Sequence, residues 1–233
     1  MWPFSRKKND LVTVSLTPQN ITCSCINTGE QTPVLKAYKR IPLKHLEFAQ
    51  AIPFNQTKLS KEIALFLTEH QLHDVDLVLA LSGPKIFETV ITLQESSPER
   101  SDFDFPGMQE MNWNFAYLCP SGRNGFDFFV CGMRQEHLLS YQLLLHRCKA
   151  SVATITAGKL AYLHLYKNIK GASFRQSELS LDLLHHRYDL TSLVNAELLA
   201  KSIEIHPNLQ LDLTTEHTFL SQSLGLFFSE RSV

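Results

Sequence analysis

The sequence predicts an α/β fold that opens with three antiparallel strands, a crossover helix and a buried parallel strand. Alternation of apolar and polar residues in three short runs between positions 11 and 41 indicates the antiparallel strands. The apolar period then becomes that of a helix over residues 59–72. A nearly continuous apolar run, Asp76–Ser82, follows it and is typical of a central strand covered on both faces.

The three alternating runs form an antiparallel meander, because only short turns separate them. The strands are Leu11–Thr17, Ile21–Asn27 and Val34–Ile41, with turns at Pro18–Asn20 and Thr28–Glu30. The rule that such crossovers are right-handed leaves few compact ways to place the helix before the buried strand. This order is therefore that of a ribonuclease-H-like, or actin-like, lobe.

A small α+β subdomain is expected as an insertion after Gly83-Pro84, and the chain then returns to the first lobe. Residues 181–187 fit either a strand or a helix. The insert has strands Ile86–Leu93, Met111–Cys119 and Phe126–Gly132 and helix Gln135–Lys149; the later elements are strand Ser151–Ile155, helix Thr156–Tyr166, helix Leu193–Ile203, strand Leu209–Leu213 and helix Phe219–Ser229.

Composition disfavours some classes of protein. The 233 residues are 44% hydrophobic and 19% charged, which suits a globular chain with a sizeable core. A formal net charge of -1 provides no basic field for nucleic acid. The odd count of five cysteines favours a reducing cytoplasmic compartment, with Cys23 and Cys25 as core residues rather than a metal or redox pair. No apolar window is long enough to span a membrane.

Catalytic motifs are absent from the sequence. It contains no GxSxG elbow, P-loop, GxGxxG or HExxH. Actin-like ATPases need aspartate and glycine in the first hairpin, where glycine lets the backbone approach phosphate, but residues 12–20 read VTVSLTPQN. His70 with His73, His164, and His185 with His186 are interpreted as packed or solvated residues rather than ligands. We therefore expect no enzyme activity, cofactor or metal.

The chain resembles the PilM family, the actin-like cytoplasmic component of type IV pilus assembly, which is related to FtsA and GspL. The resemblance lies in the order of MWPFSRKKND, LVTVSLTPQNI, DLVLALSGPKIFETVITL, the stretch FDFFVCGMRQEHLLSYQLLLHRCKASVATITAGKLAYLHLY and FLSQSLGLFFSER. Ser15 falls at the family's aspartate position and Thr17 at its glycine position, as degenerate phosphate-loop residues. The chain is short for a second actin lobe. The resemblance thus implies a leader 1–9, a first subdomain 10–84, an insert 85–149, a return 150–168, a shrunken second-lobe remnant 169–216, and a C-terminal helix 217–233 that packs back on the first lobe.

The resemblance also implies a function. A non-catalytic scaffold of pilus or related secretion assembly would bind the N-terminal cytoplasmic peptide of a PilN-like inner-membrane protein, and other pilus assembly components. It would sit at the cytoplasmic face of the inner membrane, bind no nucleic acid, and be aided there by Trp2, Phe4, Arg6, Lys7 and Lys8. The expected peptide groove contains Phe87, Val90, Ile91, Phe128, Phe129, Leu138 and Leu139.

Two alternatives remain open at this point. One is an ATP-binding protein of the actin fold, which the missing phosphate and adenosine motifs disfavour. The other is a GspL-like cytoplasmic subunit of type II secretion, which would need a membrane span after the domain.

Overall fold

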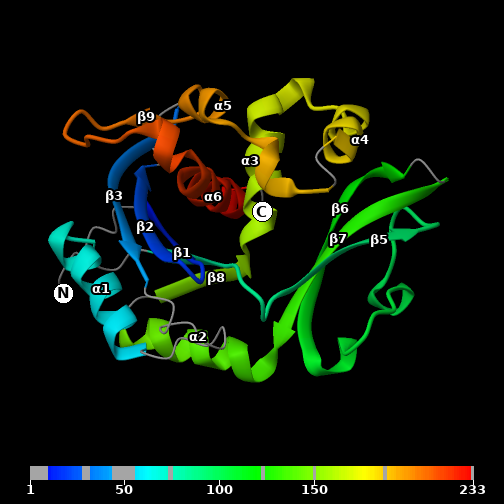
Figure 1. Ribbon diagram of the computed structural model, residues 1–233, viewed down its shortest axis with the longest axis horizontal. Coiled ribbons are helices and arrows are strands. Elements are labelled where there is room, and N and C mark those ends of the chain that lie inside the picture. The colour runs from blue at the N-terminus through cyan, green and yellow to red at the C-terminus, as the bar shows by residue number, and fades with distance from the viewer. Residues whose placement is uncertain are drawn as a thin grey trace, which may run out of the picture.

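The main sheet places strands that are distant in sequence side by side (Figure 1). The computed structural model describes residues 10–27, 32–43, 56–72, 76–121, 124–148, 151–185 and 188–231, so the predicted leader lies outside the described residues. The sheet order is β8-β4-β1-β2-β3-β9. The β1-β2 and β2-β3 pairs are antiparallel, and the β1-β4, β4-β8 and β3-β9 pairs are parallel. The strands are β1 Asp10–Leu16, β2 Asn20–Asn27, β3 Val34–Pro42, β4 Asp76–Leu81, β8 Ser151–Ala157 and β9 Glu204–Ile205.

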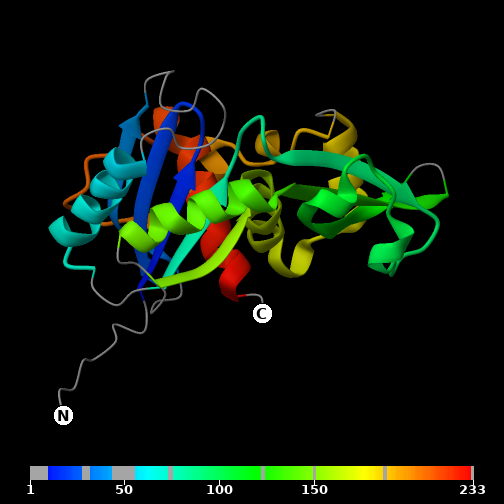
Figure 2. The same cartoon turned by 90° about the horizontal axis from the view of Figure 1, so that it is seen from below.

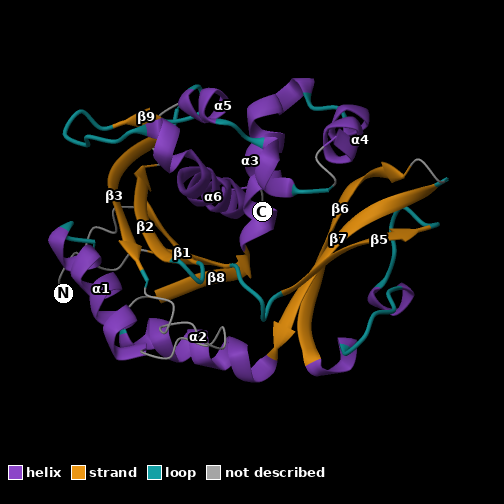
Figure 3. Cartoon of the chain, in the orientation of Figure 1, coloured by secondary structure: helices purple, strands orange, loops and turns teal. Residues whose placement is uncertain are grey.

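Helices α1, Gln56–Glu69, and α2, Gln135–Arg147, cover one face of this sheet (Figure 3). Alternate residues of β1, including Val12 and Val14, point to that face and are fully buried against Phe66 of α1. Burial of a side chain the size of Phe66 stabilises the fold by about 1.5–3 kcal/mol. The meander, the crossover helix and the parallel strand are confirmed. The helix α2, predicted as part of the insert, packs on the main sheet beside α1 instead.

Helices α3, Gly158–Lys170, and α6, Leu213–Arg231, cover the opposite face. The two helices approach closely where Gly225 meets α3. A Cβ atom on Gly225 would lie 1.9 Å from the carbonyl oxygen of Ala161, so only glycine fits there. The main-sheet residues below α6, such as Ser15 and Ala80, are small, which lets this helix lie low on the sheet.

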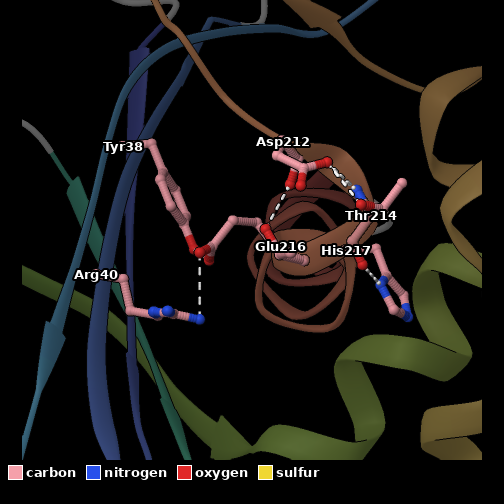
Figure 4. Close-up of polar contacts among 7 residues, drawn as sticks. Tyr38, Arg40, Asp212, Thr214, Glu216 and His217 are labelled. Carbon is pink, nitrogen blue, oxygen red and sulfur yellow. Dashed lines mark hydrogen bonds and ion pairs between the residues drawn. The ribbon is translucent and has the colours of Figure 1, made fainter.

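The first turn of α6 is fixed by polar contacts (Figure 4). Asp212 caps the helix, because its carboxylate accepts a hydrogen bond from the backbone nitrogen of Thr214 at 2.9 Å. Tyr38 on β3 donates to Glu216 at 2.6 Å, and Arg40 forms an ion pair with Glu216 at 3.2 Å. Burial and the bond to Glu216 raise the pKa of Tyr38 well above that of an exposed phenol. These contacts join the C-terminal helix to the meander.

The insert is a second, three-stranded antiparallel sheet of order β5-β7-β6 that extends to one side of the core (Figure 2). Its strands are β5 Phe87–Leu93, β6 Met111–Ser121 and β7 Gly125–Arg134. The connection from β5 to β6 carries two short 3-10 turns, η2 Arg100–Asp102 and η3 Met108–Glu110. Phe103 and Phe105 from this connection are buried on one face of the sheet, next to Phe128. An aromatic cluster therefore forms the insert's own core.

The described residues between 171 and 205, within the predicted second-lobe remnant, form short elements that pack on the first lobe and on the insert. They are η4 Gly171–Ser173, α4 Gln176–His185, η5 Leu190–Leu193, α5 Ala196–Ala200 and β9. β9 joins the main sheet, while α4 contacts β6 of the insert. The helix expected over residues 193–203 is shorter than predicted. The strand expected at Leu209–Leu213 is wrong, because the cap at Asp212 starts α6 there and the strand lies earlier, at Glu204–Ile205.

Candidate functional site

An apolar groove lies where the main sheet meets the insert. It has a volume of about 210 Å³, enough for one or two aliphatic side chains rather than a whole cofactor. The ends of β4 and β8 form one wall, β6 and β7 form the other, and α2 and α3 contribute one residue each. We call this surface the apolar groove; it is lined by Leu81, Ile86, Asn112, Trp113, Asn114, Cys131, Gly132, Met133, Leu138, Ile155, Thr156, Ala157 and Leu160.

A glycine in β7 shapes one wall of the apolar groove. Gly132 lies directly opposite Trp113 of β6. A Cβ atom on Gly132 would lie 2.7 Å from the Cβ of Trp113, too close for any side chain. The indole of Trp113 packs edge-on against Phe105 and beneath the guanidinium of Arg100, whose Cζ lies 4.6 Å from the ring centre. The wall is therefore held by the insert's aromatic cluster.

A second pocket adjoins the apolar groove and has a different character. Its volume is about 510 Å³, and it shares Ile86 with the apolar groove. Glu88, one of its lining residues, forms an ion pair with Lys159 of α3 at 2.8 Å. We call it the charged pocket; its lining residues are Pro84, Lys85, Ile86, Phe87, Glu88, Met111, Arg134, Glu136 and His137.

The structure does not bring the seven residues predicted for the groove to one surface. In an extended strand adjacent residues point to opposite faces. Ile91 pairs with Phe128 in the aromatic cluster, so neither side chain reaches the apolar groove. Their neighbours Val90 and Phe129 face the other way, against the core beneath α3.

The other three predicted groove residues also lie on different surfaces. Phe87 stacks on Phe105 in the aromatic cluster, at 4.9 Å between ring centres, and also lines the charged pocket. Leu138 lines the apolar groove. Leu139 is 47% exposed on the outer face of α2 and lines neither pocket. Sequence reasoning missed Trp113 and Gly132; a glycine inside a strand was the signal for the close approach.

The two degenerate phosphate-loop residues, Ser15 and Thr17, form hydrogen bonds within the protein. Ser15, at the degenerate aspartate position, is buried and donates a hydrogen bond to the side-chain carbonyl of Gln222 on α6. The Gln222 amide nitrogen donates in turn to the hydroxyl of Ser82 at 3.2 Å. Thr17 holds the hairpin turn, since its hydroxyl accepts from the backbone nitrogen of Asn20 at 3.0 Å. Both degenerate phosphate-loop residues are therefore engaged within the protein.

The cysteines are part of the core. All five are buried, and Cys23 and Cys25 lie on the same face of β2, as predicted. Burial raises the pKa of the Cys131 thiol, in the wall of the apolar groove, to about 12, with Glu88 adding to the effect. This thiol is protonated at neutral pH and is a poor nucleophile.

No three histidine, cysteine or acidic side chains in the described ranges lie close enough to share a metal ion. No helix in the same ranges combines the length and the apolar character needed to cross a bilayer.

The sheet order and the inserted subdomain give the chain a ribonuclease-H-like, actin-like fold. Comparison with solved structures found a similar chain. A chain in the structure of a PilM-PilN type IV pilus biogenesis complex matches with a TM-score of 0.61 and 12% identity, over 93% of this chain and 97% of that one. The chain thus has a PilM-like, actin-like fold, as the sequence resemblance predicted.

Other matches have lower TM-scores. The cytoplasmic domain of EpsL, an inner-membrane component of the Vibrio cholerae type II secretion system, matches with a TM-score of 0.42 and 17% identity, over 65% of this chain and 57% of that one. A Bacteroides thetaiotaomicron protein of unknown function with an actin-like ATPase fold matches with a TM-score of 0.38 and 15% identity, over 73% and 60%. No family model and no curated protein matches the sequence.

Proposed function

We propose that this protein is a non-catalytic adaptor of type IV pilus or related secretion assembly. It captures a short cytoplasmic segment of a PilN-like inner-membrane protein in the apolar groove, and so is held at the cytoplasmic face of that membrane. The observation that carries the proposal is the apolar groove at the junction of main sheet and insert, in a chain whose fold matches one from a PilM-PilN complex.

The apolar groove has the properties that peptide capture requires. It is open, largely apolar, and bordered by β8, an edge strand of the main sheet that pairs only with β4 among the described strands. An extended segment can place an aliphatic side chain between Leu138 and Ile155, with β8 beside it. Burial of one leucine-sized side chain there contributes about 1.5–3 kcal/mol, so several contacts are needed for micromolar affinity.

The contacts at the expected phosphate position support the absence of ATP chemistry. Gln222 is 4% exposed and joins Ser15 of β1 to Ser82 after β4. A phosphate bound there would have to displace this side chain and break both hydrogen bonds. Neither serine can hold a metal ion as an aspartate does, because a hydroxyl carries no negative charge.

Site-specific crosslinking in cells of the native organism tests the proposal. A photoreactive residue at position 138 faces the apolar groove, whereas one at position 143, on the exposed side of the same helix, faces solvent. We expect position 138 to crosslink to the N-terminal cytoplasmic segment of a PilN-like protein, with that segment identified by mass spectrometry. Equal crosslinking from both positions, or products without such a segment from position 138, would overturn the proposal.

A further inference from the structure

Two large apolar side chains are exposed on the outer side of α2. Leu139 is 47% exposed and Leu143 is 56% exposed, and they lie one helical turn apart. This helix forms the lower margin of the molecule in Figure 1 and crosses the front of Figure 2, so its outer side faces away from the main sheet. Single exposed leucines are common on protein surfaces, whereas two neighbours on one helix face make an apolar patch.

Charges of opposite sign lie at the two ends of this patch. Glu136 precedes Leu139 by three residues and Arg147 follows Leu143 by four, so all four side chains lie on one face of the helix. The side chain of Glu136 is 69% exposed. Arg147 is also exposed, and its guanidinium makes one long contact, at 3.5 Å, with the hydroxyl of Thr57. We call Glu136, Leu139, Leu143 and Arg147 the outer stripe.

The middle of the outer stripe is poor in charge. Between its two ends, the exposed residues of α2 are leucine, glutamine and histidine, with no lysine, arginine, aspartate or glutamate. The exposed side of the neighbouring helix α1, by contrast, carries Lys58 and Lys61. Depletion of charged residues distinguishes the centre of a protein interface from the rest of a surface. The outer stripe therefore has the composition of a contact surface, with an apolar centre and charged ends.

The order of residues in the outer stripe is self-complementary. The midpoint between Leu139 and Leu143 lies at Tyr141, and the midpoint between Glu136 and Arg147 lies within one residue of it. Two copies of α2 that pair antiparallel about a two-fold axis at this level place Leu139 of one copy on Leu143 of the other. The same axis places Glu136 of one copy beside Arg147 of the other. A parallel pair would instead bring like charges together.

We propose that the outer stripe is a self-association surface, through which two copies of this chain form an antiparallel, two-fold symmetric dimer across α2. The inference does not rest on the proposed function. Tyr141, Leu144 and Leu145 on the inner side of α2 are buried in the core of the main sheet, so the outer stripe is held in place before the copies meet. Four leucines make a contact smaller than a standard interface, so we expect a weak dimer, with Kd on the order of 100 µM.

Sedimentation velocity of the full chain, from low micromolar to millimolar concentration, tests the dimer. We expect the weight-average mass to rise from that of one chain towards that of two. Leu143→Arg puts positive charge into the centre of the contact and should weaken the dimer roughly tenfold or more. The mass of one chain at every concentration, or equal association of Leu143→Arg and the parent, would overturn the proposal.

An exposed leucine elsewhere provides the matched control. Leu181 on α4 is 58% exposed, and α4 packs against β6 of the insert, on the margin opposite α2 in Figure 1. Leu181→Arg makes the same chemical change without touching the outer stripe, so it should associate as the parent does. Loss of the dimer in Leu181→Arg would place the contact on another surface and contradict the proposal.

Reversal of the two charges tests the antiparallel order. Glu136→Arg and Arg147→Glu each place like charges across the antiparallel contact, and each should weaken the dimer about threefold or more at low ionic strength. The double variant restores opposite charges at both ends and should dimerise as the parent does. In a parallel pair neither single reversal would weaken the dimer. Single variants that match the parent, or a double variant as weak as the single ones, would contradict the antiparallel dimer.

The dimer and the proposed function fail separately. No residue of the outer stripe lines the apolar groove, so Leu143→Arg should lose the dimer and keep the affinity of the parent for the PilN-like segment. Calorimetric titration with that segment and sedimentation of the same sample measure both properties. Reduced affinity for the segment in Leu143→Arg, with no change in mass relative to the parent, would show that the outer stripe binds the partner rather than a second copy, and would overturn the dimer.

Discussion

The hydroxyl of Ser15 on β1 donates a hydrogen bond to the side-chain carbonyl of Gln222 on α6. These residues are 207 positions apart in sequence, and both are buried. Gly158, at the start of α3, makes room for the contact, because a Cβ atom there would lie 2.0 Å from the Gln222 amide nitrogen. The C-terminal helix therefore contacts Ser15, the residue at the degenerate aspartate position.

We predict that MgATP does not stabilise this protein. A ligand present at one hundred times its Kd stabilises the native state by about 2.7 kcal/mol, which raises Tm measurably. With Gln222 in place we expect no change of Tm in millimolar MgATP, measured by scanning calorimetry, and no release of phosphate. A saturable rise of Tm with MgATP would contradict the proposed lack of nucleotide binding.

Gln222→Ala should destabilise the fold. The change leaves the buried hydroxyls of Ser15 and Ser82 without their amide partner and opens a cavity, which together cost about 2–4 kcal/mol. Urea unfolding followed by circular dichroism measures the loss. Thr218→Ala on an exposed part of the same helix is the control and should change stability by less than about 0.5 kcal/mol. Equal effects of the two substitutions would show that the Gln222 contacts contribute nothing.

Gly225→Ala should be more disruptive than its size suggests. The added methyl would overlap the carbonyl oxygen of Ala161, and that oxygen belongs to backbone that cannot rotate away. Separation of α3 and α6 should cost roughly 3 kcal/mol, although alanine normally favours a helix. Ser229→Ala, in the last turns of α6, serves as the comparison. A Gly225→Ala protein as stable as the parent would mean that the helices pack less closely than described.

The protein should lose stability at alkaline pH through its buried thiols. A cysteine has a reference pKa of 9.0, whereas burial raises the pKa of Cys148 to about 12 in the folded state. Between these values the folded state holds more protons than the unfolded state, so the free energy of unfolding falls as pH rises. Each such thiol contributes a slope of about 1.4 kcal/mol per pH unit.

Cys148→Ser isolates one of these contributions. The hydroxyl can use the carbonyl oxygens of Leu144 and Ser60 that the thiol contacts now, but it does not titrate in this range. Urea unfolding of the parent and the variant at several pH values from 8 to 11 measures both slopes. The variant should show a shallower decline above pH 9, and parallel declines would refute the assignment to Cys148.

The sequence predicts the main sheet well, because each strand there has a regular environment. The alternation in β1 and β2 indicates that one face of each strand packs against α1. The continuous apolar run of β4 indicates that this strand is buried on both faces. The C-terminal third was less predictable. Leu209, Leu211 and Leu213 alternate with polar residues as in a strand. They lie instead just before and at the start of α6, where they are partly buried against the core below α3. Only the cap at Asp212 distinguishes the helix start, and it depends on a short local hydrogen bond.

The candidate site was less predictable than the fold, for a physical reason. Alternation shows that Val90 and Ile91 lie on opposite faces of β5, but it does not show which face meets the main sheet. That depends on how the insert packs, which is a property of contacts such as Trp113 with Gly132. Gln222 was missed because a glutamine within an apolar helix carries no pattern that identifies its partner.

Calorimetric titration with the synthetic N-terminal cytoplasmic segment of the PilN-like protein from the same organism tests the central claim most directly. We predict saturable binding to the parent protein, loss of about tenfold or more in affinity for Leu138→Arg, which blocks the apolar groove, and parent-like affinity for Leu143→Arg on the exposed side of α2. Undetectable binding to the parent, or binding that Leu138→Arg leaves unchanged, would contradict the peptide-binding function.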